Sequence, residues 1–281
     1  MSTENALLTI LAEKIKNDSL VLPTLPEIAI RVREAADDPD INLQAMSEVI
    51  AHDPALSARM LKIANSAYLG RTVKVESLHQ AVTRIGLRHI KNIATALAME
   101  QLFISHNETV KQFLDKIWLL TVEVSATAIA LMKLYTARNK HTPLSLDTIT
   151  LAAMVHNIGV LPILTEAERH PEVFANPDFL DGAIARLAGR IGGSIMRAWE
   201  FSPEFITVVE RWNDRRYETD NVSYIDFIRI AAVHVGVMPV NETLDSFYGK
   251  YVEKGIIPDE DYLEEDEFLE QYQTARTIFL D

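Results

Sequence analysis

The residues of this chain that could bind a metal ion are histidines and carboxylates, because it has 8 His, 40 Asp plus Glu and no cysteine. The lack of cysteine excludes disulfides, thiolate metal sites and a cysteine nucleophile. Two histidines have a neighbour suited to metal chemistry, in the pairs His52-Asp53 and His156-Asn157. Five others lack metal-ligand spacing such as two histidines four apart around a glutamate. These packing or surface candidates are His79, His89, His106, His141 and His170.

Helix capping explains the pair His52-Asp53 without a metal. Asp53 directly precedes Pro54. An aspartate can accept backbone N–H bonds as an N-cap, and proline suits the first helical position because it has no N–H. The sequence therefore predicts a helix that starts at Asp53 and runs to about Asn65.

Three neighbouring glycines, Gly189, Gly192 and Gly193, do not form a dinucleotide-binding motif. They lie inside a helical pattern with no preceding strand. The sequence also has no Gly-x-Ser-x-Gly segment and no Walker loop. We interpret Gly192 and Gly193 as positions where helices pack closely.

Apolar residues recur three and four apart nearly throughout the chain, which indicates an all-α protein. Short helices dominate the first 107 residues, whereas the stretch from Val110 to Tyr135 reads as one long amphipathic helix. We expect an N-terminal bundle over residues 1–107, a second bundle over 108–240 and a helical extension over 241–281. The hydrophobic content of 48% is ample for a buried core.

Most of the acidic excess lies in the expected extension. The net charge is −13, and residues 241 to 281 carry 3 basic and 12 acidic side chains. Such a segment would repel a phosphate backbone, although a solvated helix explains it equally. Its aromatic residues could anchor it on the second bundle or form a partner surface; they are Tyr248, Tyr251, Tyr262, Phe268 and Tyr272.

We expect a cytoplasmic protein with no membrane partner. The N-terminus has no basic region before an apolar run, so it does not resemble a secretory signal. The longest mostly apolar stretch, Ile149 to Leu164, falls short of the roughly 20 residues that span a bilayer.

Three segments of the first half together resemble one family. They read Ile-Ala-His-Asp-Pro-Ala-Leu from Ile50, Leu-Lys-Ile-Ala-Asn-Ser-Ala-Tyr from Leu61, and Ser-Leu-His-Gln-Ala-Val from Ser77. This combination resembles the HDOD domain, an output domain of bacterial signalling proteins related to the HD superfamily of metal-dependent phosphohydrolases. The resemblance covers about residues 20 to 240. It implies an all-α fold with the N-terminal bundle packed on a second, HD-like bundle.

The resemblance also implies where a catalytic HD site would lie, with His and Asp ligands around divalent cations that acidify a water. The His-Asp pair of that site corresponds to His156-Asn157 here, and asparagine supplies no negative charge. A first histidine ligand would fall at Leu120. A last aspartate is missing from the helix around Ile228 to Val235, and Asp226 is the nearest. We expect a vestigial site with no catalytic residue and no metal ligand.

The first-half motif supplies the candidate interaction residues. Asn65, at a helix end, can bond to carbonyls and N–H groups of the following loop. Basic residues gathered nearby would suit an anionic partner if they shared a face, although solvated helix faces are the simpler explanation; they are Arg59, Lys62, Arg71, Lys74, Arg84, Arg88 and Lys91. The full candidate set is Asp53, Pro54, Asn65, Ser66, Arg59, Lys62 and Arg88.

The sequence thus favours a noncatalytic signalling module that binds a partner protein or small ligand in trans, without a cofactor. One alternative is a residual phosphohydrolase that acts on a nucleotide or phosphodiester with a divalent metal held by His156, Asp226 or His234. A second is nucleic-acid binding through the basic residues, which we do not expect. The partner, the pathway and the oligomeric state are left open by the sequence.

Overall fold

The structure is a computed structural model that describes all residues except 1–2, 18, 67–68, 70–72, 171–176 and 281. The described residues form helices and turns and no strand, which confirms the expected all-α class. The chain divides into two compact units, each built from segments distant in sequence. The first unit comprises residues 1–24, 100–121 and 155–218, and the second comprises 25–99, 122–154 and 219–281. The division at residues 107 and 240 stays a prediction.

The first unit is a group of helices centred on α10. Its helices are α1 (Thr3–Lys16), α9 (Val160–Ala167), α10 (Pro177–Ala198) and α11 (Pro203–Arg211), with the short 3₁₀ helix η2 (Met99–Leu102) at its border. Helix α10 packs on α1, α9 and α11. An ion pair of 2.6 Å between Lys14 Nζ and Glu166 Oε2 joins α1 to α9.

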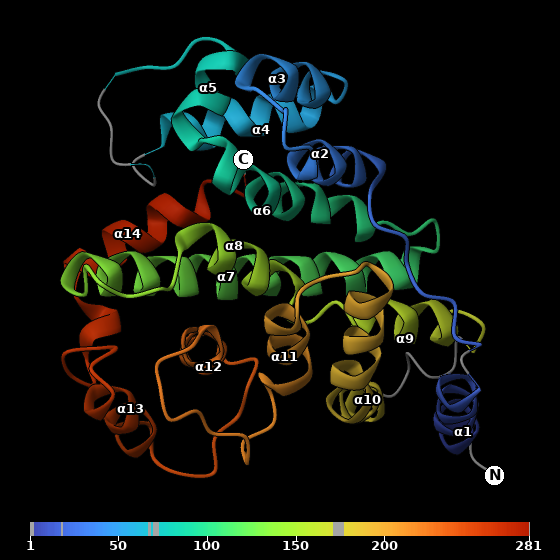
Figure 1. Ribbon diagram of the computed structural model, residues 1–281. Helices are drawn as coiled ribbons and strands as arrows, with labels where there is room; N and C mark the ends of the chain where they lie inside the picture. Colours follow the sequence, from blue (N-terminus) through green and yellow to red (C-terminus); the bar gives the residue numbers. More distant parts are fainter. Residues whose placement is uncertain (1–2, 18, 67–68, 70–72, 171–176, 281) are drawn as a thin grey trace. The chain divides into compact units, whose positions relative to one another are not determined.

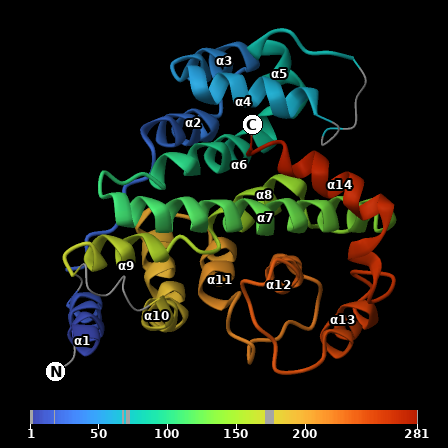
Figure 2. The same cartoon turned by 180° about the vertical axis from the view of Figure 1, so that it is seen from behind.

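The second unit begins with a bundle of five short helices, which Figures 1 and 2 show gathered together. They are α2 (Glu27–Asp37), α3 (Leu43–Ala51), α4 (Pro54–Asn65), α5 (Leu78–Ile85) and α6 (Leu87–Ala98). The remaining helices of this unit are α12 (Tyr224–His234), α13 (Leu244–Glu253), the 3₁₀ helix η4 (Tyr262–Glu264) and α14 (Asp266–Arg276). Helix α4 packs on α3, α5 and α6.

Polar caps determine where the short helices start. Asp53 Oδ1 accepts a bond of 2.8 Å from Leu56 N, which confirms the expected cap of α4. Ser77 and Gln80 form a reciprocal capping box at the start of α5. Gly86 has φ +86°, a left-handed backbone that glycine adopts without strain, and it separates α5 from α6.

Two helices contribute to both units, α7 (Glu108–Arg138) and α8 (Leu146–Val155). The length of α7, and of the segment that runs from α8 through the following turn to the end of α9, bears on the membrane prediction. The segments Glu108–Arg138 and Leu146–Ala167 are long and apolar enough to cross a bilayer, so the length argument drawn from the sequence was wrong. Of their most apolar windows, 67% and 89% are buried inside the protein, as expected for core helices.

The aromatic residues of the C-terminal region are packed inward. Tyr248, Tyr251, Tyr262 and Phe268 are all buried. Arg138 of α7 donates a bond of 2.7 Å to the Tyr262 hydroxyl and another of 2.7 Å to the carbonyl of Ile256. Tyr262 thus joins this region to α7, while acidic side chains such as Glu264 and Glu267 stay exposed.

Candidate functional site

His156 lies in the turn between α8 and α9 and is only 3% exposed. Its ring meets the buried Trp212 edge-on, with the ring centroids 4.8 Å apart. Helix α8 ends at Val155. The turn that follows is closed by a bond of 3.0 Å from Ile158 N to Val155 O. His156 is therefore buried, and packing against an indole fixes its ring.

The turn that carries His156 is pressed against α10. A Cβ atom on Gly159 would lie 2.6 Å from Gly192 N and closer still to the carbonyl of Ala188, so only glycine fits. Gly192 and Gly193 face the side chains of Val209 and Glu210 on α11 just as closely. The predicted role of Gly192 and Gly193 in close helix packing is confirmed.

The residues at the family's ligand positions do not fit a divalent cation. Asn157 is a neutral amide and Leu120 an aliphatic side chain, and both are partly exposed. A cation there would lack the carboxylate that offsets its charge. Across the described ranges of the chain, no group of three or more His, Asp and Glu residues could hold a metal ion. His156, Asn157 and Leu120 belong to the first unit, and Asp226 to the second.

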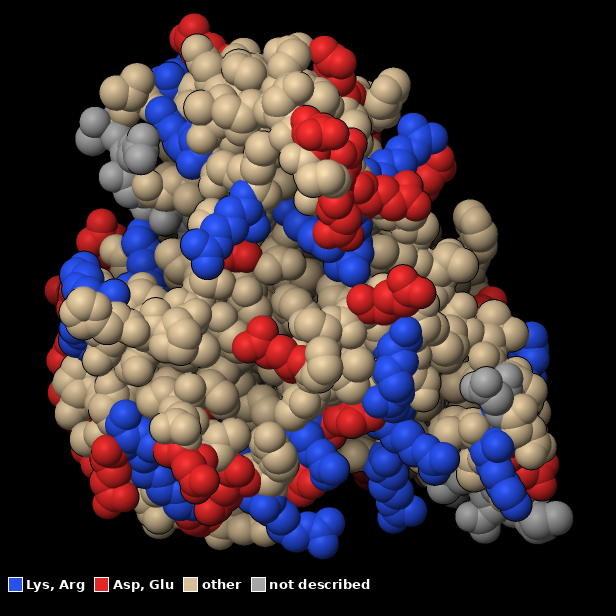
Figure 3. Space-filling view, in the orientation of Figure 1, with Lys and Arg blue, Asp and Glu red and all other residues tan. Residues whose placement is uncertain are grey.

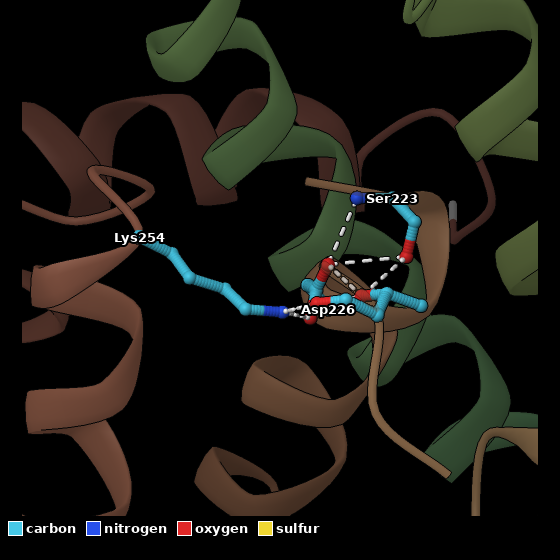
Figure 4. Close-up of polar contacts among 4 residues, drawn as sticks. Ser223, Asp226 and Lys254 are labelled. Atoms are coloured by element: carbon cyan, nitrogen blue, oxygen red, sulfur yellow. Dashed lines mark hydrogen bonds and ion pairs between the residues drawn. The ribbon is translucent and has the colours of Figure 1, made fainter. Parts of the chain in front are cut away.

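Asp226 of the second unit accepts several bonds from neighbouring residues (Figure 4). Its side chain is 3% exposed, and its Oδ1 accepts a bond of 2.9 Å from Lys254 Nζ. Its Oδ2 accepts bonds from Ser223 N at 2.8 Å, Ser223 Oγ at 3.1 Å and Thr219 Oγ1 at 3.2 Å. Lys254 also donates to Thr219 O at 2.8 Å.

Because of these bonds, Asp226 is not available as a metal ligand. An ammonium group already neutralises the carboxylate, and every bond fastens the start of α12 to neighbouring segments. His234, at the other end of α12, is eight residues and thus about 12 Å further along the helix axis. Desolvation lowers the pKa of His234, and Glu264 acts in the opposite direction. Asp226 and His234 cannot bind one ion together.

Asn65 ties the end of α4 to the loop before α5. Its Nδ2 donates to Val75 O at 2.8 Å, and Val75 N donates to its Oδ1 at 2.7 Å. This pair of bonds is the carbonyl and N–H contact predicted for Asn65. Ser66 Oγ donates to Ile63 O at 2.8 Å and closes the last turn of the helix. Pro54 is exposed at the first position of α4.

The basic interaction candidates are used in different ways. Arg59 donates to Leu97 O of α6 at 2.9 Å, and Lys62 donates to Leu280 O at 2.8 Å. Arg84 holds the carbonyl of Ala64 at 3.0 Å, whereas Arg88 at the start of α6 is exposed. Arg71, like Ala67 and Tyr68 of the motif, lies outside the described residues.

Figure 3 shows basic and acidic side chains interspersed on the face drawn. Lys91 illustrates this pairing, because its Nζ bonds both carboxylate oxygens of Asp37, at 2.5 and 2.7 Å. Such neutralisation reduces the attraction that a basic stripe would exert on a phosphate backbone.

Two polar clusters of the second unit escaped the sequence analysis. Lys254 is 28 residues from Asp226 and carries no local motif, so no spacing signals their contact. His89 was treated as a packing residue, yet its Nδ1 lies 2.7 Å from Oδ1 of the buried Asp147. Asn92 donates to the other oxygen of Asp147 at 2.7 Å. Residues three apart share a helix face, so the spacing of His89 and Asn92 was the signal in the sequence that could have indicated this cluster.

Comparison with known proteins identifies several relatives. The family model of the HDOD domain matches residues 22–214. A solved structure from Shewanella amazonensis SB2B, named as a candidate metal-dependent phosphohydrolase, is 44% identical. It aligns over 99% of this chain and 100% of its own, with a TM-score of 0.94. A 91-residue segment is 30% identical to an uncharacterized protein of Treponema pallidum (strain Nichols) and spans 32% of this chain but only 18% of that protein.

Two more distant structures support the fold alone. An HDOD domain protein with unknown function from Geobacter sulfurreducens is 18% identical over 99% of both chains, with a TM-score of 0.68. A candidate signal transduction protein from Marinobacter aquaeolei VT8 is also 18% identical, over 100% of this chain and 66% of its own, with a TM-score of 0.64. All these similarities agree with an HD-like helical architecture.

Proposed function

Because this chain belongs to the HDOD domain family, we propose that it is a signalling module that binds a partner protein or small ligand in trans and catalyses no reaction. The observation that carries the proposal is that the residues of the HD pair, His156 and Asn157, do not suit a divalent cation. His156 is buried against Trp212, and its partner is the neutral Asn157. Neither side chain supplies the charge that a divalent cation requires.

The bonding of Asp226 supports the same proposal. Oδ2 of Asp226 accepts bonds from Ser223 and Thr219, and Oδ1 accepts one from the Lys254 ammonium, which stands where a cation would have to bind. Exchange of a metal for this ammonium would break several bonds inside a buried cluster. We assign Asp226 a structural role in the placement of α12.

The partner-binding face is proposed to lie on the N-terminal bundle, around α4 and the start of α6. Arg88 is the exposed cation of this face, and Asn65 and Asp53 hold its helix ends in place. The module would act in the cytoplasm of a bacterium, and the segments 1–107, 108–240 and 241–281 would be its functional divisions.

The alternative of a residual phosphohydrolase is favoured by one specific observation, the name of the Shewanella relative at 44% identity. The metal content of gently purified protein, measured by elemental analysis, distinguishes the noncatalytic module from the residual phosphohydrolase. A noncatalytic module holds far less than one equivalent of divalent metal and hydrolyses neither a generic phosphodiester nor cyclic nucleotides with added manganese. Near-stoichiometric metal with turnover that is lost in His156→Ala, but retained in the exposed control His106→Ala, would overturn the proposal.

Partner binding is tested directly by a photo-crosslinking side chain placed at Arg88 in the cells that produce the protein. We expect one defined adduct at this position and none at the control position Arg216, whose side chain is 96% exposed. Adducts of equal yield at both positions would contradict a dedicated face on the N-terminal bundle. Nucleic acid as the partner would show in an adduct that nuclease removes and salt suppresses.

A further inference from the structure

The segment after α14 is packed into the second unit. Ile278 is 2% and Phe279 5% exposed. Lys62 Nζ donates to the carbonyl of Leu280 at 2.8 Å. Lys62 belongs to α4, so this bond places Leu280 beside that helix. We call residues 277–280 the end segment.

A separate anchor leads the end segment to α4. Glu123 of α7 accepts a bond of 2.7 Å from Arg276 Nε and a second, very short bond from the Tyr272 hydroxyl. Burial, and after it the contact with Glu123, raises the pKa of Tyr272 to about 12, so the phenol stays protonated and donates. Helix α14 is thereby fixed along α7 whether or not the end segment is bound.

Lys62 belongs to the motif helix on which the proposed function relies, but its ammonium is engaged by a main-chain carbonyl. Any peptide offers such a carbonyl, so this bond does not depend on the side chain of Leu280. Selectivity must come from the aliphatic and aromatic side chains that are buried, Ile278 and Phe279. The contact therefore has the features of peptide recognition, with one main-chain bond and two apolar side chains.

From these contacts we propose that α4 carries a peptide-binding site that the end segment fills in cis. Resting on the proposed function, this inference names the partner chemistry: a protein segment with an aliphatic residue, then an aromatic one, then a carbonyl for Lys62. Such a segment displaces residues 277–280 and takes their place. A tethered segment acts at an effective concentration in the millimolar range, so a free peptide binds the intact protein about 100-fold more weakly than a released form.

The test uses the full chain and a labelled, amidated peptide with the sequence of residues 274–281, Thr-Ala-Arg-Thr-Ile-Phe-Leu-Asp. In the protein, Phe279→Asp releases the end segment and is expected to raise peptide affinity about 100-fold. Adding Lys62→Met to that variant should lower the affinity about fivefold, since one bond to a charged donor is lost. The matched control is Leu269→Asp, on the exposed side of α14, which should behave as the wild type.

Trypsin gives a second readout that needs no released variant. The bond after Arg276 is protected in the wild type while the end segment is bound, and millimolar peptide should accelerate cleavage there several-fold. A peptide in which the phenylalanine is aspartate should have no effect. A folded Phe279→Asp protein that does not bind the peptide, or cleavage that the peptide leaves unchanged, would overturn the inference.

The inference and the proposed function fail in different ways. Absence of peptide binding with an intact crosslink at Arg88 would remove the α4 peptide site and leave the signalling module in place. Metal-dependent turnover lost in His156→Ala would remove the noncatalytic proposal, whatever the peptide result.

Discussion

The buried pair of Asp226 and Lys254 offers the sharpest test of the structural argument. Lys254→Met removes the ammonium but keeps a chain of similar length. The carboxylate of Asp226, 3% exposed, then loses its only charged partner among the described residues. It keeps the bonds from Ser223 and Thr219 to its other oxygen. The variant therefore contains a buried carboxylate that is half satisfied.

The expected cost follows from burial and from the remaining bonds. Breaking a fully buried ion pair costs about 3–5 kcal/mol, because an uncompensated charge is left behind. Lys254 is 28% exposed, so water can partly replace the ammonium, and the bonds to Oδ2 persist. We therefore expect a loss of about 2 kcal/mol, equivalent to a lower melting temperature by about 3 °C for a protein of this size.

Urea denaturation followed by circular dichroism measures this loss. The control is Lys250→Met in α13, the helix that Lys254 directly follows, because Lys250 pairs with Glu242 in an exposed bridge and should contribute under about 0.5 kcal/mol. In the Asp226→Asn background, Lys254→Met should cost about 1 kcal/mol less, since the charge it neutralised is gone. If Lys254→Met and Lys250→Met are indistinguishable, the structural role of the cluster is refuted.

Three further outcomes are expected. Asn65→Ala should destabilise the protein by about 1–2 kcal/mol in urea titration, because both bonds to Val75 are lost; an unchanged midpoint would contradict this. Gly159→Ala forces a Cβ atom into the backbone of α10 and should cost about 2–3 kcal/mol, whereas Gly182→Ala, with open space, should be neutral or stabilising; equal melting temperatures would argue against the packing. The lowered pKa of His234 means that the unfolded chain binds its proton first, so stability falls as the pH drops from about 6.5 through the folded pKa, and His234→Gln should flatten this slope.

Local signals made much of the fold predictable. Asp53 before Pro54 and Ser77 before Gln80 start helices by short-range hydrogen bonds, and Gly86 separates helices through its backbone. Each of these signals depends on residues within about four positions of one another, so all the interacting residues can be recognised in a short stretch of sequence. The contact of Asn65 is less local, because its loop partner Val75 is ten residues away, yet an asparagine at a helix end was enough to predict bonds to the following loop.

The sequence reveals the changed chemistry of the degenerate HD pair, His156 and Asn157, but not the geometry around it. An asparagine at position 157 cannot supply a charge in any fold. The packing of His156 on Trp212, and of Gly159 on α10, joins segments that are distant along the chain. No periodicity predicts which distant aromatic ring meets a given histidine.

Residue type and neighbours within a turn or two set the helical class, the helix starts and the loss of ligand chemistry at Asn157 and Leu120, so all three can be predicted from the sequence. The contacts of Lys254 with Asp226 and of Lys62 with the end segment emerge only when the helices pack. Those contacts join positions 28 and 218 residues apart. Their formation depends on how helices pack, which is the sum of many weak contacts and leaves no local pattern in the sequence.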